Sequence, residues 1–209
     1  MTELIPLWFY AVTSIFYTCS AIICFLVSYF GFKAHRITSE KSHLFLFLGF
    51  LTLGLGFLVL SVPSLFTYAT LELYHGSSIS INLINYYGFR LYYIVSLFAY
   101  FMLFLSYLPK KLRSKFFILF VPIWYASSFE FHVLSVALIS FIVFRCAANL
   151  KEKKNLNSGL VTYAFTSILV FHLLLLLTPF SGSVYFVANI FLITGFVSLL
   201  YMLIRVVCK

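Results

Sequence analysis

Hydrophobic residues in this chain gather into long runs that short polar or charged segments separate. An α-helix needs about 20 predominantly apolar residues to cross the hydrocarbon core of a bilayer. The pattern therefore predicts an all-α fold, a polytopic membrane helix bundle that forms a single integral membrane domain over residues 1–209. The seven predicted transmembrane helices lie near residues 6–30, 43–67, 86–108, 112–127, 129–148, 159–178 and 184–206.

The segment 112–148 also allows an alternative, one long helix, which would leave six crossings. The sequence Ser127-Ser128-Phe129-Glu130 has the form of a capping box, in which Ser127 and Glu130 satisfy free amides at a helix start. Two crossings also place the basic segments 110–115 and 151–154 on the same side of the membrane, whereas one crossing separates them. We therefore interpret this segment as two helices joined by a tight turn.

The positive charge of the chain is distributed unevenly between the two predicted membrane faces. The chain has 14 Lys and Arg against 5 Asp and Glu, which gives a net charge of +9. Every Lys and Arg except Arg90 falls in alternate connections or at the C-terminus. Because cytoplasmic loops carry an excess of Lys and Arg, this distribution predicts an outside N-terminus, a cytoplasmic C-terminus and an odd number of crossings.

The composition excludes a large soluble domain. The chain is 63% apolar and 9% charged, with a mean hydropathy of +1.08, whereas a soluble domain is about a quarter charged. Seven helices use about 140 residues, so no soluble catalytic or nucleic-acid-binding domain fits in the remainder. We expect a multi-pass protein of the cell membrane whose partners are the lipid bilayer and other membrane protein subunits, and not nucleic acid.

One internal repeat is suggested by the spacing of polar and proline residues. Ser42 and Pro63 bracket the second predicted helix, and Ser158 and Pro179 bracket the sixth with the same separation. Aligning these helices superposes helices one to three on helices five to seven in the same orientation, with the fourth as a linker. This 3+1+3 parallel repeat is the layout of some transporters.

The second predicted helix carries a packing motif, Gly49-Phe50-Leu51-Thr52-Leu53-Gly54-Leu55-Gly56. Gly49, Thr52 and Gly56 are three and four residues apart, so they line one face where a neighbouring helix can approach closely. With the preceding Lys33-Ala34-His35-Arg36-Ile37-Thr38-Ser39-Glu40-Lys41, the motif resembles a loose group of small, seven-helix membrane proteins that are common in archaea. The resemblance covers the first two helices and implies a multi-helix membrane fold without a particular activity.

Several chemistries are missing from the chain. It has no Asp, and its Glu residues fall in tails, loops or helix ends, so no carboxylate is available inside the membrane for ion coupling or for acid–base and metal chemistry. The last predicted helix, 184–206, contains no lysine that could bind retinal. No phosphate-binding glycine loop is present. We therefore expect no catalytic residues and no metal site.

The remaining polar residues inside the predicted helices gather toward the outer leaflet: Arg90, His132, His172 and Asn189. Burying such groups is costly, so they are candidate ligand-binding residues. Each also fits a structural role, because Arg90 can snorkel to the interface, His132 can be solvated, and His172 can bond one carbonyl or hydroxyl. A functional site requires Arg90 and His172 to face the bundle interior, with His172 beside a cavity open to the outside.

Three classes of function remain. The absence of catalytic groups favours a non-catalytic subunit, scaffold or sensor, without a cofactor, that binds a partner protein, a lipid or an apolar ligand. The repeat and Arg90 favour a small-solute carrier as an alternative. A redox or enzyme subunit is the third class, with His132 and His172 as axial haem ligands or with a cysteine-based site. The order Cys19, Arg90, His172 resembles that of transmembrane sorting peptidases of the exosortase and archaeosortase type, although the Glu-Ala-Cys-Ser-Gly setting of their nucleophile is absent.

Overall fold

The computed structural model describes residues 7–74, 78–109, 112, 127–178 and 183–207, and this part of the chain folds into six helices. They are α1 (Leu7–Thr38), α2 (Lys41–Tyr74), α3 (Ser78–Tyr107), α5 (Ser128–Lys153), α6 (Leu156–Leu176) and α7 (Ser183–Val207). All six are long and apolar enough to span a membrane. The predicted all-helical fold is therefore confirmed, with helices of the kind that form a multi-pass membrane protein. The helix predicted at 112–127 lies almost entirely outside the described residues.

The helices run further than the apolar runs predicted, above all where α2 meets α3. The prediction that the second helix ends at 67 and the third begins at 86 was wrong, because α2 continues to Tyr74 and α3 starts at Ser78. Pro63 lies inside α2 without ending it. Its ring packs so closely on α3 that a Cβ added at Gly88 would lie 2.9 Å from Pro63 Cγ. Neighbouring helices make proline tolerable inside a membrane helix, and hydropathy marks the edge of the hydrocarbon layer rather than the helix end.

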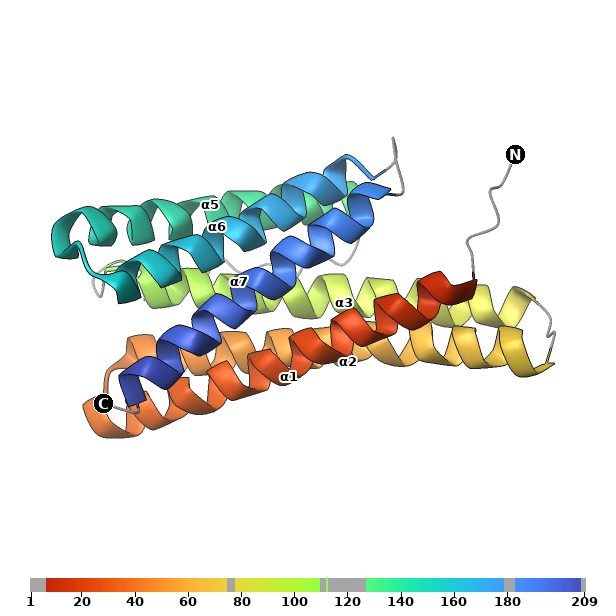
Figure 1. Ribbon diagram of the computed structural model, residues 1–209, viewed down its shortest axis with the longest axis horizontal. Helices are drawn as coiled ribbons and strands as arrows, with labels where there is room; N and C mark the ends of the chain where they lie inside the picture. The colour runs from red at the N-terminus through yellow and green to blue at the C-terminus, as the bar shows by residue number, and fades with distance from the viewer. Residues whose placement is uncertain (1–6, 75–77, 110–111, 113–126, 179–182, 208–209) are drawn as a thin grey trace.

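The six helices form a closed ring in the order α1, α2, α3, α5, α6, α7 (Figure 1). Helices that follow each other along the chain run antiparallel, except α3 and α5, which run in the same direction (Figure 1). Tyr93 of α3 stacks on Phe131 of α5, and further along the same helices Phe104 contacts Phe141, with ring centroids 4.6 Å and 4.8 Å apart. α7 closes the ring against α1, and both begin at the same end (Figure 1). We call that end the α2–α3 end and the opposite one, where α7 finishes, the C-terminal end.

The glycine motif of α2 lies against α3. A Cβ added at Gly49 would lie 2.7 Å from Leu103 Cδ2, and one added at Gly56 would lie 3.0 Å from Ser96 Oγ. Thr52, the third residue of the motif, is half-buried. The missing side chains let the two helices approach closely, as small residues do in membrane bundles. Because α2 also packs on α1, it is the middle helix of its half of the ring.

Hydroxyl groups and a second glycine hold other helix pairs together. Thr18 Oγ1 of α1 lies 2.6 Å from Ser61 Oγ of α2, and Ser14 Oγ lies 3.2 Å from the same oxygen. On the other side of the ring, a Cβ added at Gly195 of α7 would lie 2.9 Å from the carbonyl oxygen of Ala164 in α6. Both halves of the ring therefore contain closely packed helix pairs.

The helix ends around α5 are set by local hydrogen bonds. The predicted capping box is confirmed, since Ser127 N donates to Glu130 Oε2 at 2.7 Å and Glu130 N donates to Ser127 Oγ at 3.3 Å. At the other end of α5, Lys154 adopts the left-handed conformation with φ 44°. Asn155 then begins α6 by accepting a bond from Ser158 N at 2.8 Å. α5 and α6 thus form a tight hairpin at the C-terminal end.

Side chains on the outer surface of the ring differ in kind from those in its interior. Large apolar residues such as Ile15, Val62 and Phe144 are more than half exposed on its outer surface, which suits contact with lipid. The interior is filled mainly by aromatic side chains, of which the largest fully buried are Tyr100, Phe50, Phe57, Phe131, Phe165, Phe171 and Phe196. Most of the buried polar residues are small serines and threonines, so the larger ones, His132, His172 and Asn189, mark candidate sites.

Candidate functional site in the helix ring

Two histidines from neighbouring helices meet inside the ring. His132 lies in the first turns of α5 and His172 near the end of α6, and their Nδ1 atoms are 2.9 Å apart. Nε2 of His172 is 2.8 Å from the hydroxyl oxygen of Tyr100 in α3. The exposed fractions of these side chains are 6% for His132, 0% for His172 and 1% for Tyr100. Three helices thus share one buried hydrogen-bonded chain, which we call the His–Tyr chain.

The His–Tyr chain has two self-consistent proton arrangements. A bond between two Nδ1 atoms needs one donor and one acceptor, so one of the two Nδ1 atoms carries no proton. If neutral His172 donates from Nδ1, its Nε2 accepts from the Tyr100 hydroxyl. If it accepts at Nδ1 from His132, its Nε2 donates to that hydroxyl. The same heavy-atom positions therefore fit both arrangements. The His–Tyr chain can switch between the two proton arrangements when the hydrogen bonding at either end changes.

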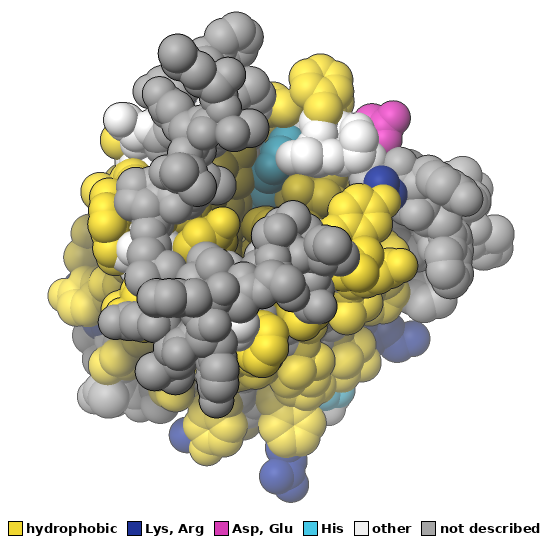
Figure 2. Space-filling model, turned by 90° about the vertical axis from the view of Figure 1, so that its right-hand side faces the viewer, with side chains coloured by type: hydrophobic (Ala, Val, Ile, Leu, Met, Phe, Trp, Pro, Cys, Tyr) yellow, Lys and Arg dark blue, Asp and Glu magenta, His cyan; other side chains and the backbone are white. Residues whose placement is uncertain are grey.

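Aromatic rings enclose most of the His–Tyr chain. The Phe131 ring lies 4.9 Å from the His132 ring and 5.6 Å from that of His172, and Phe171 lies 5.0 Å from His172 between centroids. The expectation that His172 borders a cavity open to the outside was wrong, because Tyr100 and these rings leave it no exposed surface. His132 keeps a small exposed area. Seen from the α2–α3 end, a histidine surface lies in a hollow beside apolar side chains (Figure 2).

A second polar cluster lies between α1 and α7. The hydroxyl oxygens of Tyr17 and Tyr185 are 2.6 Å apart, and Asn189 Nδ2 donates to the carbonyl oxygen of Tyr185 at 2.9 Å. The side chains of Thr13 and Asn189 both lie beside the Tyr185 hydroxyl. Thr13 and Asn189 are buried. We call Thr13, Tyr17, Tyr185 and Asn189 the α1–α7 cluster.

Some polar atoms inside the ring have no hydrogen-bond partner. In the described part of the chain, five buried side-chain oxygens are unpartnered, and they come from α1, α3, α5 and α7: Thr13 Oγ1, Ser20 Oγ, Ser96 Oγ, Ser135 Oγ and Asn189 Oδ1. Two of the five belong to the α1–α7 cluster, and Ser135 follows His132 by about one helical turn. Thr13 and Asn189 lie beside the Tyr185 hydroxyl, and Ser96 lies beside the Tyr92 hydroxyl. Buried polar groups normally have partners, so Ser20 Oγ and Ser135 Oγ are the two oxygens of this set for which a further polar group is expected.

Arg90 lies apart from both polar clusters. It is half-buried, and its guanidinium carbon lies 5.1 Å from the centroid of the Tyr86 ring one turn earlier in α3. The Glu130 carboxylate accepts from the Ser127 backbone amide, and the side chain of Glu72 lies outside the described residues. Of the four predicted residues, the structure brings together His132 and His172, places Asn189 in the α1–α7 cluster, and leaves Arg90 beside a tyrosine.

The geometry does not suit the two enzyme alternatives. A metal ion between two imidazole nitrogens would hold them about 4 Å apart, since each metal–nitrogen bond is about 2 Å long. The 2.9 Å between the histidine Nδ1 atoms therefore leaves no space for a haem iron between them. Cys19 is exposed on α1, whereas His172 is sealed inside the ring, so the order Cys19, Arg90, His172 does not form one site.

The residues that sequence reasoning missed are the tyrosines and small hydroxyls of the ring interior. Tyr100 lies well inside α3, away from the helix ends where aromatic belts are expected. A tyrosine at that depth signals a polar partner, because its hydroxyl needs one when buried. Tyr185 and Asn189 are four residues apart and so share one helix face, a second signal that was available. Ser96 and Ser135 gave no such signal.

No protein-family model, curated protein or solved structure matches this chain. The candidate site is therefore assigned from its own geometry.

Proposed function

We propose that this protein is a non-catalytic binding subunit or sensor of the cell membrane that takes a small hydrogen-bonding ligand into its helix ring. The unpartnered oxygens of Ser20 and Ser135 carry the proposal, and further polar atoms for a ligand come from three residues beside tyrosine hydroxyls, namely Thr13, Ser96 and Asn189. Each buried polar atom without a partner costs about 1–3 kcal/mol, and hydrocarbon supplies no water to replace the lost bond. A ligand with hydroxyl or amide groups offsets these costs, which an apolar ligand cannot do.

The distribution of the oxygens favours sensing as the consequence of binding. They lie on helices of both halves of the ring, α1 and α3 in one and α5 and α7 in the other. A ligand that bridges them therefore acts on the contacts of α3 with α5 and of α7 with α1. The His–Tyr chain crosses the first of these contacts, and its two proton arrangements provide a means of response. Other membrane protein subunits would read the change in helix packing.

The proposal includes seven crossings with an outside N-terminus. α3 and α5 run in the same direction, so the end of α3 and the start of α5 lie toward opposite ends of the ring (Figure 1). If the six described helices cross the membrane, these two helix ends lie on opposite sides of it, and the proposal is that the chain between them crosses once more. The C-terminal end carries most of the described cations, among them Lys33, Arg36, Lys41, Lys151, Lys153, Lys154 and Arg205. This asymmetry supports a cytoplasmic C-terminus.

A small-solute carrier of 3+1+3 design is the second candidate, and the order of helices in the ring favours it. In such a repeat α1 corresponds to α5, α2 to α6 and α3 to α7. The contact of α3 with α5 then corresponds to the contact of α7 with α1. Both contacts are present. Exchange-related halves are the layout of carriers that have parallel repeats.

The binding proposal is tested by what the purified protein retains. Wild type is purified in mild detergent beside the double variant Thr13→Val, Asn189→Leu, and the extracted small molecules are compared by mass spectrometry. Thr18→Val is the control, because Thr18 already has partners in Ser14 and Ser61. We expect a polar small molecule in stoichiometric amount with wild type and control and its loss from the double variant. Equal retention by all three, or no stoichiometric molecule, contradicts the proposal.

The same preparation separates the remaining alternatives. A membrane protein that co-purifies in stoichiometric amount supports a subunit role. A monomer that exchanges the identified molecule across liposomes supports the carrier instead.

A further inference from the structure

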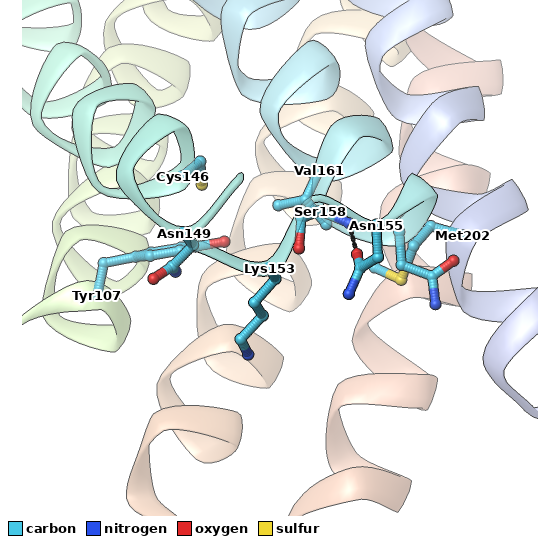
Figure 3. A pocket seen from close by; sticks show the side chains of 9 residues that line it. Tyr107, Cys146, Asn149, Lys153, Asn155, Ser158, Val161 and Met202 are labelled. Carbon is cyan, nitrogen blue, oxygen red and sulfur yellow. Dashed lines mark hydrogen bonds between the residues drawn. The ribbon is translucent and has the colours of Figure 1, made fainter. Parts of the chain in front are cut away.

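A cavity of about 250 Å³ opens at the C-terminal end of the ring, away from both polar clusters (Figure 3). Its walls come from the ends of α3 and α5, the start of α6 and one residue of α7. Asn149 and Lys153 line it from the last turns of α5, and Asn157 and Ser158 from the first turn of α6. The pocket therefore lies at the ends of helices that are long and apolar enough to span a membrane.

The chemistry of this pocket is that of an anion site. Among the described residues that line it, Lys153 is the only charged one and none carries a carboxylate. The first turn of α6 has no acidic residue, so its positive helix end has no internal counter-charge there. The Asn155 side chain accepts from the Ser158 amide at 2.8 Å (Figure 3), and the Asn155 carbonyl accepts from the Gly159 amide at 3.1 Å. The amides of Leu156 and Asn157, at the very start of α6, have no carbonyl one turn earlier in the helix to bond to. The amide groups of Asn149 and Asn157 add donors.

We propose that this C-terminal pocket binds an anionic phosphate group, carried either by a phospholipid headgroup or by a free phosphate. A phosphate presents several acceptor oxygens at once, which suits a pocket lined by donors from two helices, α5 and α6, and helix starts are ready sites for it. Membrane proteins bind anionic headgroups in basic pockets between helices on the cytoplasmic side. The other cations at this end of the ring raise the local concentration of anions. The site is independent of the proposed ligand in the ring interior.

The test compares two lysines on one helix. Lys153→Gln removes the cation that lines the pocket, and Lys151→Gln removes an exposed cation two residues away that does not line it. Both variants lose one positive charge, so general electrostatic attraction changes equally. Binding is followed by native mass spectrometry in detergent with three probes, namely phosphatidylglycerol, zwitterionic phosphatidylcholine and inorganic phosphate.

Cys146 provides a second readout because it lines the pocket and is 3% exposed. An occupied pocket should slow its alkylation by a small maleimide. Cys19, exposed on α1, serves as the internal reference whose rate should stay constant.

Wild type and Lys151→Gln should bind one phosphatidylglycerol or phosphate and protect Cys146, and Lys153→Gln should bind it about tenfold more weakly, the effect expected for one charge-assisted contact. Retention of phosphatidylglycerol alone assigns the lipid source, whereas competition by inorganic phosphate assigns the free anion. Equal loss in the two variants, equal binding of phosphatidylcholine, or no binding of any probe would overturn the proposal.

Discussion

His172 uses both of its ring nitrogens inside an apolar core, and this makes it the residue on which the candidate site depends most. Its Nδ1 meets His132 and its Nε2 meets the Tyr100 hydroxyl, so it joins α6 to both α5 and α3. A hydrogen bond contributes about 1 kcal/mol on balance, but an orphaned buried partner costs about 1–3 kcal/mol. Removing His172 therefore leaves two buried side chains, His132 and Tyr100, without this partner.

We expect His172→Leu to lower the free energy of unfolding by about 2–4 kcal/mol, because it leaves the Tyr100 hydroxyl and His132 Nδ1 without partners. Tyr100→Phe removes only one bond and should cost less. Unfolding in detergent, followed by circular dichroism, measures both. In the double variant the two losses should be less than additive, since they share one bond. Full additivity would show that the His172–Tyr100 contact contributes nothing.

Two threonines of α1 allow a second prediction about single side chains. Thr13 Oγ1 is buried without a partner, whereas Thr18 Oγ1 donates to the Ser14 carbonyl at 2.8 Å and lies 2.6 Å from Ser61 Oγ. In protein stripped of bound small molecules, Thr13→Val should stabilise the bundle by about 1 kcal/mol, because it removes an unpaired polar atom. Thr18→Val should destabilise it by about 1 kcal/mol. Equal losses in thermal unfolding would mean that the Thr13 hydroxyl already has a partner, for which the Tyr185 hydroxyl beside it is the nearest candidate.

At the scale of helices, close contact depends on glycines whose missing side chains let backbones meet. Gly195→Ala should cost about 1–3 kcal/mol, because the new Cβ would lie 2.9 Å from the carbonyl oxygen of Ala164 and 3.0 Å from Ser167 Cβ, and backbone cannot yield cheaply. Gly159→Ala is the matched control, since its Cβ would meet only Leu150 Cδ1 at 3.9 Å. That change should be neutral or stabilise α6 by up to about 1 kcal/mol. Similar melting temperatures for the two variants would contradict this assignment of the α6–α7 contact.

The sequence was informative about helices and less so about their ends and partners. Apolar runs located the described helices, and the Ser127–Glu130 spacing located the start of α5, because these signals are local. The end of α2 was placed too early, since Pro63 is accommodated by Gly88 on another helix and no local signal reports that contact.

The candidate site shows the same division between local and non-local signals. His132 and His172 were singled out because each is polar in an apolar run. Their meeting with Tyr100 depends on how α3, α5 and α6 are arranged, which periodicity does not encode. Arg90 and Asn189 were expected at a similar depth, yet they lie in other surroundings because depth along a helix does not fix the direction of a side chain.

At the scale of the whole molecule, the direction of α3 and α5 decides how many times the chain crosses the membrane. An ordinary hairpin would place the end of one helix beside the start of the next. Here the start of α5 lies beside the middle of α3, as the Tyr93–Phe131 stacking shows, and further along both helices Phe141 lies beside Phe104, so the two helices run in the same direction. Leu112, just past α3, and Ser128, the first residue of α5, are therefore expected on opposite sides of the membrane.

Single cysteines at these two positions test the expectation in intact cells, in a background without the native thiols of Cys19, Cys24, Cys146 and Cys208. Both positions are exposed. With an outside N-terminus, Ser128→Cys should react with a membrane-impermeant maleimide from outside, whereas Leu112→Cys should react only after permeabilisation. Asn155→Cys, at the hairpin between α5 and α6, is the control and should behave like Leu112→Cys. Labelling of both test positions from the same side would mean six crossings. Labelling of Leu112→Cys and Asn155→Cys from outside, with Ser128→Cys protected, would keep seven crossings but reverse the orientation that the cations at the C-terminal end predict.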